Sequence, residues 1–402
     1  MLIFVLMKKD FCPECGPAGV NHFVTKWSQL LEAISLGFTK PLAPVVRFLS
    51  TEFYIQIDWL SYVFLHILSY LRLLSLREKP SLELDTDRAK CMWEAGIKFG
   101  VKIKEVWVLG RPINIFLAKL PSGRKIVFEG LPRSGAPTDA LEWMDNKSEV
   151  KKRLGKANFP VPRGGAFFFY SSARKFFKKF ASTVIAKPVF GSRSRHTRIH
   201  IKDENFLEES FFVVKQICPF VSVEEELQGL VHRVALIGGK CVAVLRRDPP
   251  YVIGDGTHSI KELIKISNND HRRKGVFHEI PINFELDMEL KNQGIDKNFV
   301  PESGAWFSVG TKIGRSQGGV NTDVTDFVHP KNKIMFENMA SFINDPLIGV
   351  DFIIKDIGRP FDEQLPCGVI ELNSIPFLDL HMYPFEGKER DLSKILWEEV
   401  LK

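Results

Sequence analysis

Two short apolar runs near the end of the chain, Gly349-Val-Asp-Phe-Ile-Ile354 and Val369-Ile-Glu-Leu-Asn373, carry polar residues in their interiors. Runs this rich in β-branched residues are typical of strands, and we predict that the two pair. Because side chains alternate along a strand, Glu371 and Asn373 share one face, and Asp351 stands on the neighbouring run. Hard oxygen ligands grouped in this way suit Mg²⁺. The sequence therefore predicts a metal site of Asp351, Glu371 and Asn373, with ordinary surface acids as the simpler alternative.

Two lysines upstream stand at the ends of predicted elements. Lys147 begins a charged helix over Asn146–Leu154, and Lys187 ends a strand that reads Ser182-Thr-Val-Ile-Ala-Lys-Pro. A single lysine at a strand end is usually just solvated. Two lysines that precede a set of acids have the charge and reach to clamp a triphosphate.

A third stretch, Val221-Ser-Val-Glu-Glu-Glu-Leu-Gln-Gly229, is a strand that leads into acids. Its backbone N–H and C=O groups suit the edge of an adenine ring. The alternative is a charged strand end without a ligand.

Taken together and in order, these stretches resemble the ATP-grasp superfamily, and within it the ATP-grasp domain of cyanophycin synthetase. The bacterial dual-function ligase of glutathione synthesis is a relative. The resemblance covers about residues 140–395. Its most specific stretches are Arg246-Arg-Asp-Pro-Pro-Tyr-Val-Ile-Gly-Asp-Gly-Thr-His-Ser-Ile, Ser316-Gln-Gly-Gly-Val-Asn-Thr-Asp-Val-Thr-Asp-Phe-Val-His-Pro and Glu371-Leu-Asn-Ser-Ile-Pro-Phe-Leu-Asp-Leu-His.

The resemblance implies an α+β ATP-grasp fold, in which two α/β lobes grip ATP, with a helical N-terminal extension. It also implies a role for each matching position. Phosphate would be bound by Lys147, Lys187 and Arg195, and adenine by Glu224, Glu225, Glu226 and Leu227. Two Mg²⁺ ions would be bound by Asp351, Glu371 and Asn373. The acyl phosphate would be oriented by Arg233, Arg246, His258 and the turn of Ser316, Gly318 and Gly319.

The phosphate loop departs from the family pattern. Ser194 and His196 replace expected glycines, which let backbone amides approach phosphate closely. We expect Arg193, Arg195 and His196 to compensate with side-chain charge.

Two further positions also differ. Val231 stands where relatives carry an acid for the ribose hydroxyls, so Glu226 becomes the candidate for that contact. Phe377 follows Pro376 where a glycine is expected, and its ring narrows the acceptor site.

The resemblance implies an ATP-dependent carboxylate–amine ligase that forms an amide or peptide bond through an acyl phosphate and releases ADP and phosphate. Amino acids or peptides are the implied substrates, and the sequence does not name them. The alternative is a catalytically degenerate ATP-binding scaffold that docks a partner or a membrane through its N-terminal helix. The second, Mur-ligase-like half of cyanophycin synthetase has no counterpart here, because no GxxxxGK[ST] motif occurs. We therefore do not expect this sequence to make cyanophycin by itself.

The 402 residues, 45% apolar and 26% charged, are enough for two or three domains. We predict a helical extension over 1–85, a small α/β lobe over 86–140 and the ATP-grasp domain over 141–402. Within the last, 145–230 form the ATP subdomain and 231–400 the catalytic and metal subdomain.

The N-terminal extension is predicted to be helical, with breaks at Pro41, Pro44 and Pro80. Between Trp59 and Leu76, apolar residues at 60, 64, 67, 71 and 74 trace one face and polar residues at 58, 61, 69 and 72 trace another. This pattern favours an amphipathic helix that contacts the protein, a partner or a membrane surface over a spanning one.

The formal charge of +7 is modest, and no aromatic–basic repeat suggests nucleic acid. The spacing of Cys12 and Cys15 is that of half a zinc site or of a redox pair, but no second CxxC and no nearby histidine pair completes a metal set, so we do not expect a metal there. No signal peptide is evident, so reduced thiols and a cytoplasmic protein are expected, with a homo-oligomer left open.

Overall fold

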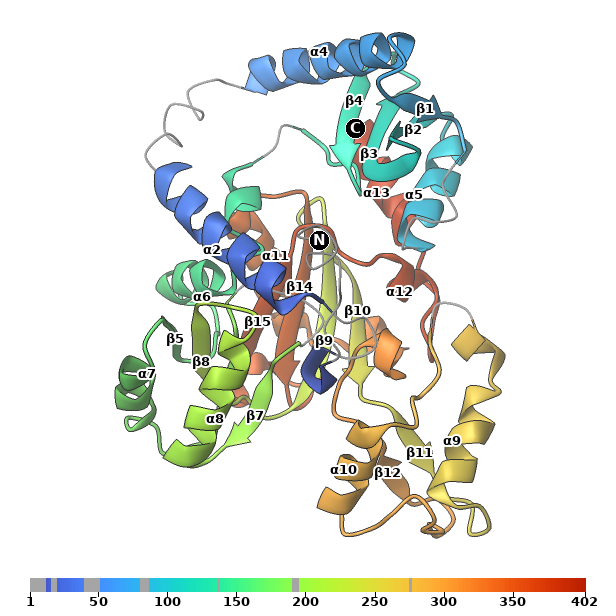
Figure 1. Cartoon of the computed structure of the whole chain (residues 1–402). Helices are drawn as coiled ribbons and strands as arrows, with labels where there is room; N and C mark the ends of the chain where they lie inside the picture. The colour runs from blue at the N-terminus through green and yellow to red at the C-terminus, as the bar shows by residue number, and fades with distance from the viewer. Residues whose placement is uncertain are drawn as a thin grey trace, which may run out of the picture.

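The computed structural model describes residues 12–15, 20–39, 51–79, 87–135, 138–189, 195–274 and 277–402. Their strands form four sheets, with the orders β1-β2-β3-β4, β5-β8-β6-β7, β11-β12 and β13-β10-β9-β14-β15 (Figure 1). All the paired strands within these sheets are antiparallel.

The five-stranded sheet lies at the centre of the molecule. It contains β9 (Leu230–Ile237), β10 (Lys240–Asp248), β13 (Val320–Asp323), β14 (Leu347–Ile354) and β15 (Gly368–Asn373). A hairpin turn at Gly238-Gly239 joins β9 to β10, and both glycines have the positive φ that such turns demand. One face packs on α6 (Lys147–Lys156) and α11 (Pro330–Ile343) through a core that includes Leu154, Phe336 and Phe352. Because helices cover this face of the central sheet, we expect the polar residues of a functional site on its other face.

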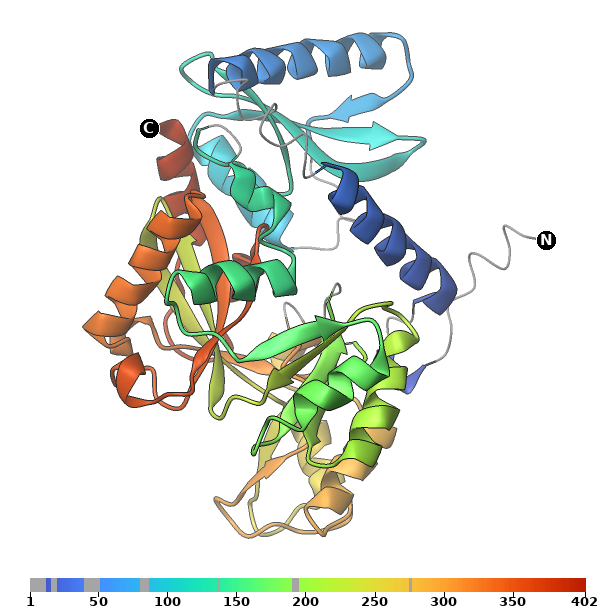
Figure 2. The ribbon, with the colours of Figure 1, turned by 90° about the vertical axis from the view of Figure 1, so that its left-hand side faces the viewer.

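A second sheet stands beside the central one and carries its own helices (Figure 2). It contains β5 (Gly164–Phe167), β6 (Val184–Pro188), β7 (Arg198–Ile201) and β8 (Val221–Glu225), with α7 (Tyr170–Phe177) and α8 (Glu204–Lys215) packed on one face. Its other face is therefore available to meet the central sheet.

A third sheet, near the C-terminus in Figure 1, contains β1 (Ser75–Arg77), β2 (Lys102–Val108), β3 (Arg111–Lys119) and β4 (Lys125–Glu129). Helices α5 (Asp87–Lys98) and α13 (Leu392–Leu401) pack together beneath it, and Trp397 Nε1 donates to the Met92 carbonyl at 2.7 Å. This core also includes Ala235 and Leu347 of the central sheet, so the third sheet, the central sheet and α13 share it.

The N-terminal helices are α2 (His22–Thr39) and α4 (Thr51–Tyr70). The prediction of a helix to Leu76 is wrong at its C-terminal end, because Ser75–Arg77 pairs with β2 as a strand. The predicted breaks at Pro41, Pro44 and Pro80 lie outside the described residues.

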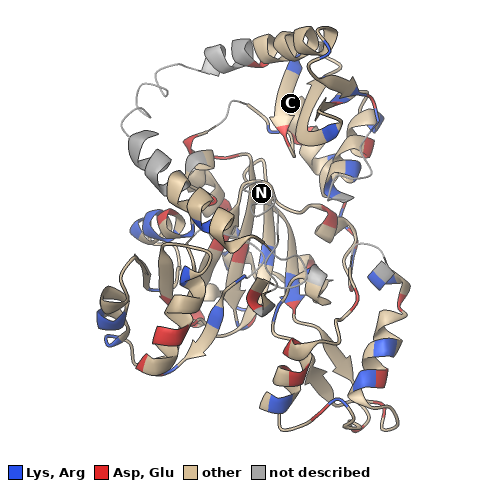
Figure 3. Ribbon diagram, viewed as in Figure 1, with Lys and Arg blue, Asp and Glu red and all other residues tan. Residues whose placement is uncertain are grey.

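The amphipathic pattern of α4 is real, but its apolar side faces outward. Leu60, Phe64 and Ile67 are each at least half exposed, whereas Asp58 is partly buried and accepts from the backbone of Val127 in β4. Figure 3 shows the described part of α4 as almost uncharged. In the part of the chain that the structure describes, none of the helices has the length and apolar character needed to cross a membrane.

An insertion after β10 folds as a separate small unit. It contains β11 (Tyr251–Ile253), β12 (Trp306–Ser308), α9 (Ile260–Asn268) and α10 (Phe284–Asn292), with its own apolar core. A reciprocal cap fixes the start of α9: the side chains of Ser259 and Glu262 each accept a hydrogen bond from the other residue's backbone amide. The short helix α12 (Asp379–Met382) follows β15 on the way to α13.

Candidate active site

A cavity of about 290 Å³ lies between the second sheet and the central sheet. Its walls are apolar and come from both sheets: Ile185, Leu227, Val231, Ile353 and Ile370. Lys147, Lys187, Arg195 and Glu371 also line it. A narrow apolar slot with charged groups beside it suits a planar base that carries anionic groups.

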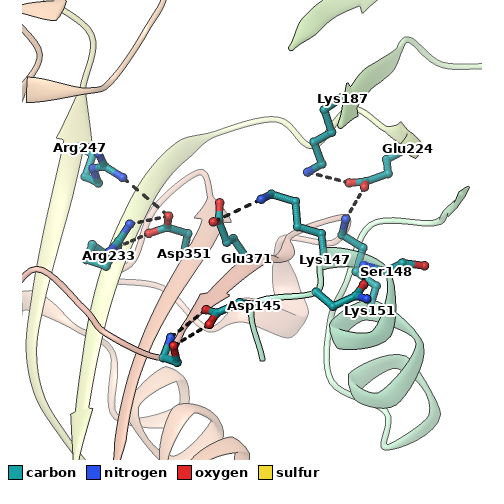
Figure 4. Close-up of polar contacts among 12 residues, drawn as sticks. Asp145, Lys147, Ser148, Lys151, Lys187, Glu224, Arg233, Arg247, Asp351 and Glu371 are labelled. Atoms are coloured by element: carbon teal, nitrogen blue, oxygen red, sulfur yellow. Dashed lines mark hydrogen bonds and ion pairs between the residues drawn. The ribbon is translucent and has the colours of Figure 1, made fainter. Parts of the chain in front are cut away.

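Both lysines that the sequence singled out line the cavity, and each forms an ion pair with a carboxylate there (Figure 4). Lys187 Nζ lies 3.0 Å from Glu224 Oε2, and Lys151 of α6 contacts the other oxygen of the same carboxylate. Glu224 is fully buried. Burial alone would raise the pKa of this carboxyl, but the charges of Lys187 and Lys151 hold its pKa at about 2.

One carboxylate therefore faces two ammonium groups. Burial, together with the charge of Lys187, lowers the pKa of Lys151 to about 7. This surplus of positive charge at the end of β6 is suited to a phosphate. The Glu224 carboxylate forms ion pairs with Lys151 and Lys187, whereas the sequence analysis assigned Glu224 to adenine binding.

The other predicted adenine residues line the cavity at the end of β8. Their side chains have partners elsewhere: Glu225 binds Arg163 at 2.9 Å, and Glu226 binds His200 at 2.8 Å. The Glu225 and Glu226 amides donate to backbone carbonyls of neighbouring segments. Hydrogen bonds to an adenine edge would therefore depend on the Leu227 amide and on backbone carbonyls.

The predicted metal ligands lie together on β14 and β15. Asp351 and Glu371 are cross-strand neighbours, and Glu371 Oε1 lies 3.4 Å from Lys147 Nζ (Figure 4). Asp145 binds the amide and hydroxyl of Ser374 at 3.0 and 2.6 Å, which ties the start of α6 to the end of β15. Carboxylate and amide oxygens at this spot fit Mg²⁺ by their chemistry.

Asp351 differs from the other two because arginines already hold it. Arg233 binds both carboxylate oxygens, with Nη2 to Oδ2 at 2.8 Å, and Arg247 Nη1 lies 3.7 Å from Oδ2. Within the described residues, Arg233 Nη1 and Arg247 Nε have no hydrogen-bond acceptor although both are buried. Burial and the charge of Arg233 lower the pKa of Arg247 to about 10. Arg233 is buried and Arg247 is partly buried, and each has one buried donor atom without an acceptor among the described residues, so the two guanidinium groups make an anion-binding pair.

Arg246, which the sequence placed in the site, is not brought together with these residues. It lies on the other face of β10, where it binds Asp248 at 2.8 Å. The sequence could not choose between adjacent arginines without the strand register. Arg247 pairs across from Val231, two residues before Arg233, so it shares the Arg233 face.

The remaining predicted residues lie around the insertion. Gly318 and Gly319 lie in a turn that has no room for side chains. A Cβ at Gly319 would lie 2.7 Å from the Ile313 carbonyl oxygen, and a Cβ at Gly318 would lie 2.7 Å from the Cα of Ile280. The side chain of Ser316, in the same turn, lies outside the described part of the structure. His258 pairs with Asp255 at 2.6 Å and does not line the cavity.

The same turn presents Arg315, which the sequence analysis missed. Arg315 Nη1 binds Asp379 at 2.6 Å, and its guanidinium lies 5.2 Å from the Phe377 ring centroid. Arg88 of α5 lies 5.0 Å from the same ring. The unexpected phenylalanine ring therefore lies close to two cations.

His196 does not serve the phosphate loop as expected. Its side chain is fully buried against Cys12, Cys15 and His22, whereas Arg195 lines the cavity. Gly191–Ser194, with Arg193, lie outside the described residues. The sequence showed no nearby histidine pair beside the two cysteines; folding brings His196 to them from 181 residues away, next to His22.

Comparisons with known proteins agree with this architecture. Cyanophycin synthetase of Trichormus variabilis is 30% identical over 258 residues, which are 63% of this chain and 28% of that protein. The bifunctional glutathione biosynthesis protein of Mannheimia succiniciproducens is 31% identical over 260 residues, which are 62% of this chain and 34% of that protein. The chain thus spans about a third of the length of these relatives. No protein-family profile matches it.

The crystal structure of a bifunctional glutathione synthetase from Pasteurella multocida superposes with a TM-score of 0.58 at 24% identity. The match covers 78% of this chain and 43% of that one. This likeness confirms the predicted α+β ATP-grasp fold.

Proposed function

This chain is an ATP-grasp protein related to cyanophycin synthetase and to the bifunctional glutathione biosynthesis protein, and we propose that it is an ATP-dependent carboxylate–amine ligase. It would join an amino acid or peptide to an amine and release ADP and phosphate. The observation that carries this is the arginine pair of Arg233 and Arg247, each with one buried donor atom that has no acceptor among the described residues, beside the acids of β14 and β15.

The nucleotide would occupy the slot between the sheets. The base would lie against Ile185, Val231 and Ile353, and the phosphates would reach Lys147 and Lys187, all of which line the cavity. The surplus charge of the Lys187–Lys151–Glu224 cluster attracts them. Glu371 and Asn373, with Asp351 beside them, would hold Mg²⁺, which neutralises phosphate charge when bound.

The reaction needs a carboxylate next to the γ-phosphate. Attack of that carboxylate oxygen on the phosphorus breaks the bond to the β-phosphate and yields an acyl phosphate and ADP. An amine then attacks the acyl carbon, and phosphate leaves with its bonding electrons. Arg233 and Arg247 would stabilise the negative charge that develops on the transferred group and on the tetrahedral centre.

The acceptor side is bounded by Arg315, Phe377 and Arg88. The ring narrows this side, and the two cations favour a substrate with an additional carboxylate. This is the chemistry of an amino acid or of a peptide C-terminus.

A turnover assay with pooled amino acids and peptides tests the proposal. We expect Lys187→Ala and Glu371→Ala to lower amine-dependent ADP release about 100-fold or more, because each removes charge from the phosphate or metal site. The control is Lys178→Ala, an exposed lysine near the second sheet. Unchanged turnover in both site variants would overturn the proposal. ATP binding without amine-dependent turnover in the wild-type chain would instead support the scaffold function.

A further inference from the structure

We propose that Cys12, Cys15, His22 and His196 bind a zinc ion that fastens the N-terminal segment to the second sheet. One ligand atom from each residue lies within 4.8 Å of the other three. This site is separate from the nucleotide cavity and does not depend on the proposed ligase function.

The distances match a tetrahedral site. Cys15 Sγ lies 3.2 Å from His22 Nε2 and 3.3 Å from His196 Nε2, and Cys12 Sγ lies 3.6 Å from His196 Nε2. Zinc bonds of about 2.3 Å to sulfur and about 2.0 Å to nitrogen place neighbouring ligand atoms about 3.5 Å apart. Two cysteines and two histidines in this geometry favour zinc.

The backbone arranges the cysteine pair. A turn over η1 (Pro13–Cys15), closed by the Cys15 amide donating to the Cys12 carbonyl at 3.1 Å, brings the two thiols to one side. This is the C-x₂-C spacing of zinc sites. His22 follows at the first residue of α2, so three ligands come from one short segment.

The fourth ligand is held ready by its surroundings. His196 Nδ1 donates to the Val213 carbonyl at 2.7 Å, which leaves Nε2 to point at the sulfurs. A ring nitrogen fixed in this way is the usual support of a histidine that binds zinc. His196 is fully buried, Cys15 is 5% exposed, and no carboxylate joins the set.

Four protein ligands leave no open position, so the ion is structural rather than catalytic. It would join Cys12, Cys15 and His22 to the described segment that begins at Arg195. Hydrogen bonds already run along this junction: the His196 amide donates to the Glu14 carbonyl at 3.3 Å, and Arg195 Nε donates to the Cys15 carbonyl at 3.4 Å. Because Arg195 also lines the nucleotide cavity, the ion would fix one end of the phosphate loop.

The test is elemental analysis of the full chain, purified with reductant and without affinity metals. We expect about one zinc per chain. Cys12→Ser, Cys15→Ser and His196→Asn should lower that content about tenfold or more. The matched controls, Cys367→Ser for a buried cysteine and His271→Asn for an exposed histidine, should retain it.

A second measurement needs no variant. Replacement of the metal in the wild-type chain by Co²⁺ should give a thiolate-to-cobalt charge-transfer band and the visible bands of a tetrahedral site. A wild-type chain that takes up neither Zn²⁺ nor Co²⁺ would overturn the proposal. So would metal content that survives in the cysteine variants, or a native disulfide between Cys12 and Cys15.

Discussion

Glu224 shows how much of the site rests on one buried carboxylate. It sits between Lys187 of the second sheet and Lys151 of α6, which packs on the central sheet. Its negative charge compensates for only one of the two lysines. Removal of Glu224 would leave two buried ammonium groups, whereas removal of Lys151 would leave a balanced pair.

The pH dependence of stability follows from this imbalance. The pKa of Lys151 is about 7 in the folded chain against an ordinary 10.5. Between these values the unfolded chain binds more protons at this position, so the free energy of unfolding rises with pH. Its contribution is at most about 1.4 kcal/mol for each pH unit.

We therefore predict that Lys151→Met flattens the rise in the free energy of unfolding above pH 7, measured by urea denaturation. Lys152→Met, on the exposed side of the same helix, should follow the wild type. Identical pH profiles for the Lys151 variant and the wild type would contradict the assignment of a low pKa to this lysine.

Single residues were predictable where type and place agree. Lys147, Lys187 and Glu371 stand at element ends, and folding brings all three to the cavity. Arg247 was missed because the choice between it and Arg246 depends on strand register. His196 was misassigned because its partners are 181 residues away in the sequence.

At the scale of elements, α4 is the least expected feature. Its apolar stripe faces water, and its polar side contacts β4, so hydrophobic patterning alone would place it the wrong way round. The strands and α9 were easier, because their alternation, glycine turns and caps are local signals. The end of α4 could not be predicted from local sequence, because it depends on the pairing of Ser75–Arg77 with β2, a strand about 30 residues later in the chain.

A pair of identical substitutions checks this orientation. Leu60 in α4 is 56% exposed, and Leu131 is 1% exposed. Leu131→Ala should cost about 2–5 kcal/mol of unfolding free energy, whereas Leu60→Ala should change it by less than about 0.5 kcal/mol. A large cost at Leu60 would mean that something covers the stripe in solution.

For the whole molecule, α5 near residue 90 and α13 near residue 400 share one core. Trp397 of the last helix packs among residues of α5, the third sheet and the central sheet. The boundaries placed at residues 85 and 140 from the sequence remain proposals, and this shared core argues that the small lobe does not fold apart from α13. Sequence patterns cannot report a core assembled from segments about 300 residues apart, as Trp397 and Met92 are.

The cavity likewise belongs to the whole molecule, because its walls come from two sheets. We propose that this cavity brings a carboxylate to the γ-phosphate of ATP. The acids and the buried arginines lie on the central sheet, and Lys187 lies on the other.

The most direct test is oxygen transfer. The chain is supplied with ATP, Mg²⁺, amines and a pool of amino acids and peptides whose carboxylates carry ¹⁸O, in ordinary water. An acyl phosphate requires that the released phosphate contain a single ¹⁸O from the carboxylate and that the nucleotide product be ADP. Unlabelled phosphate, or AMP with pyrophosphate, would contradict the account.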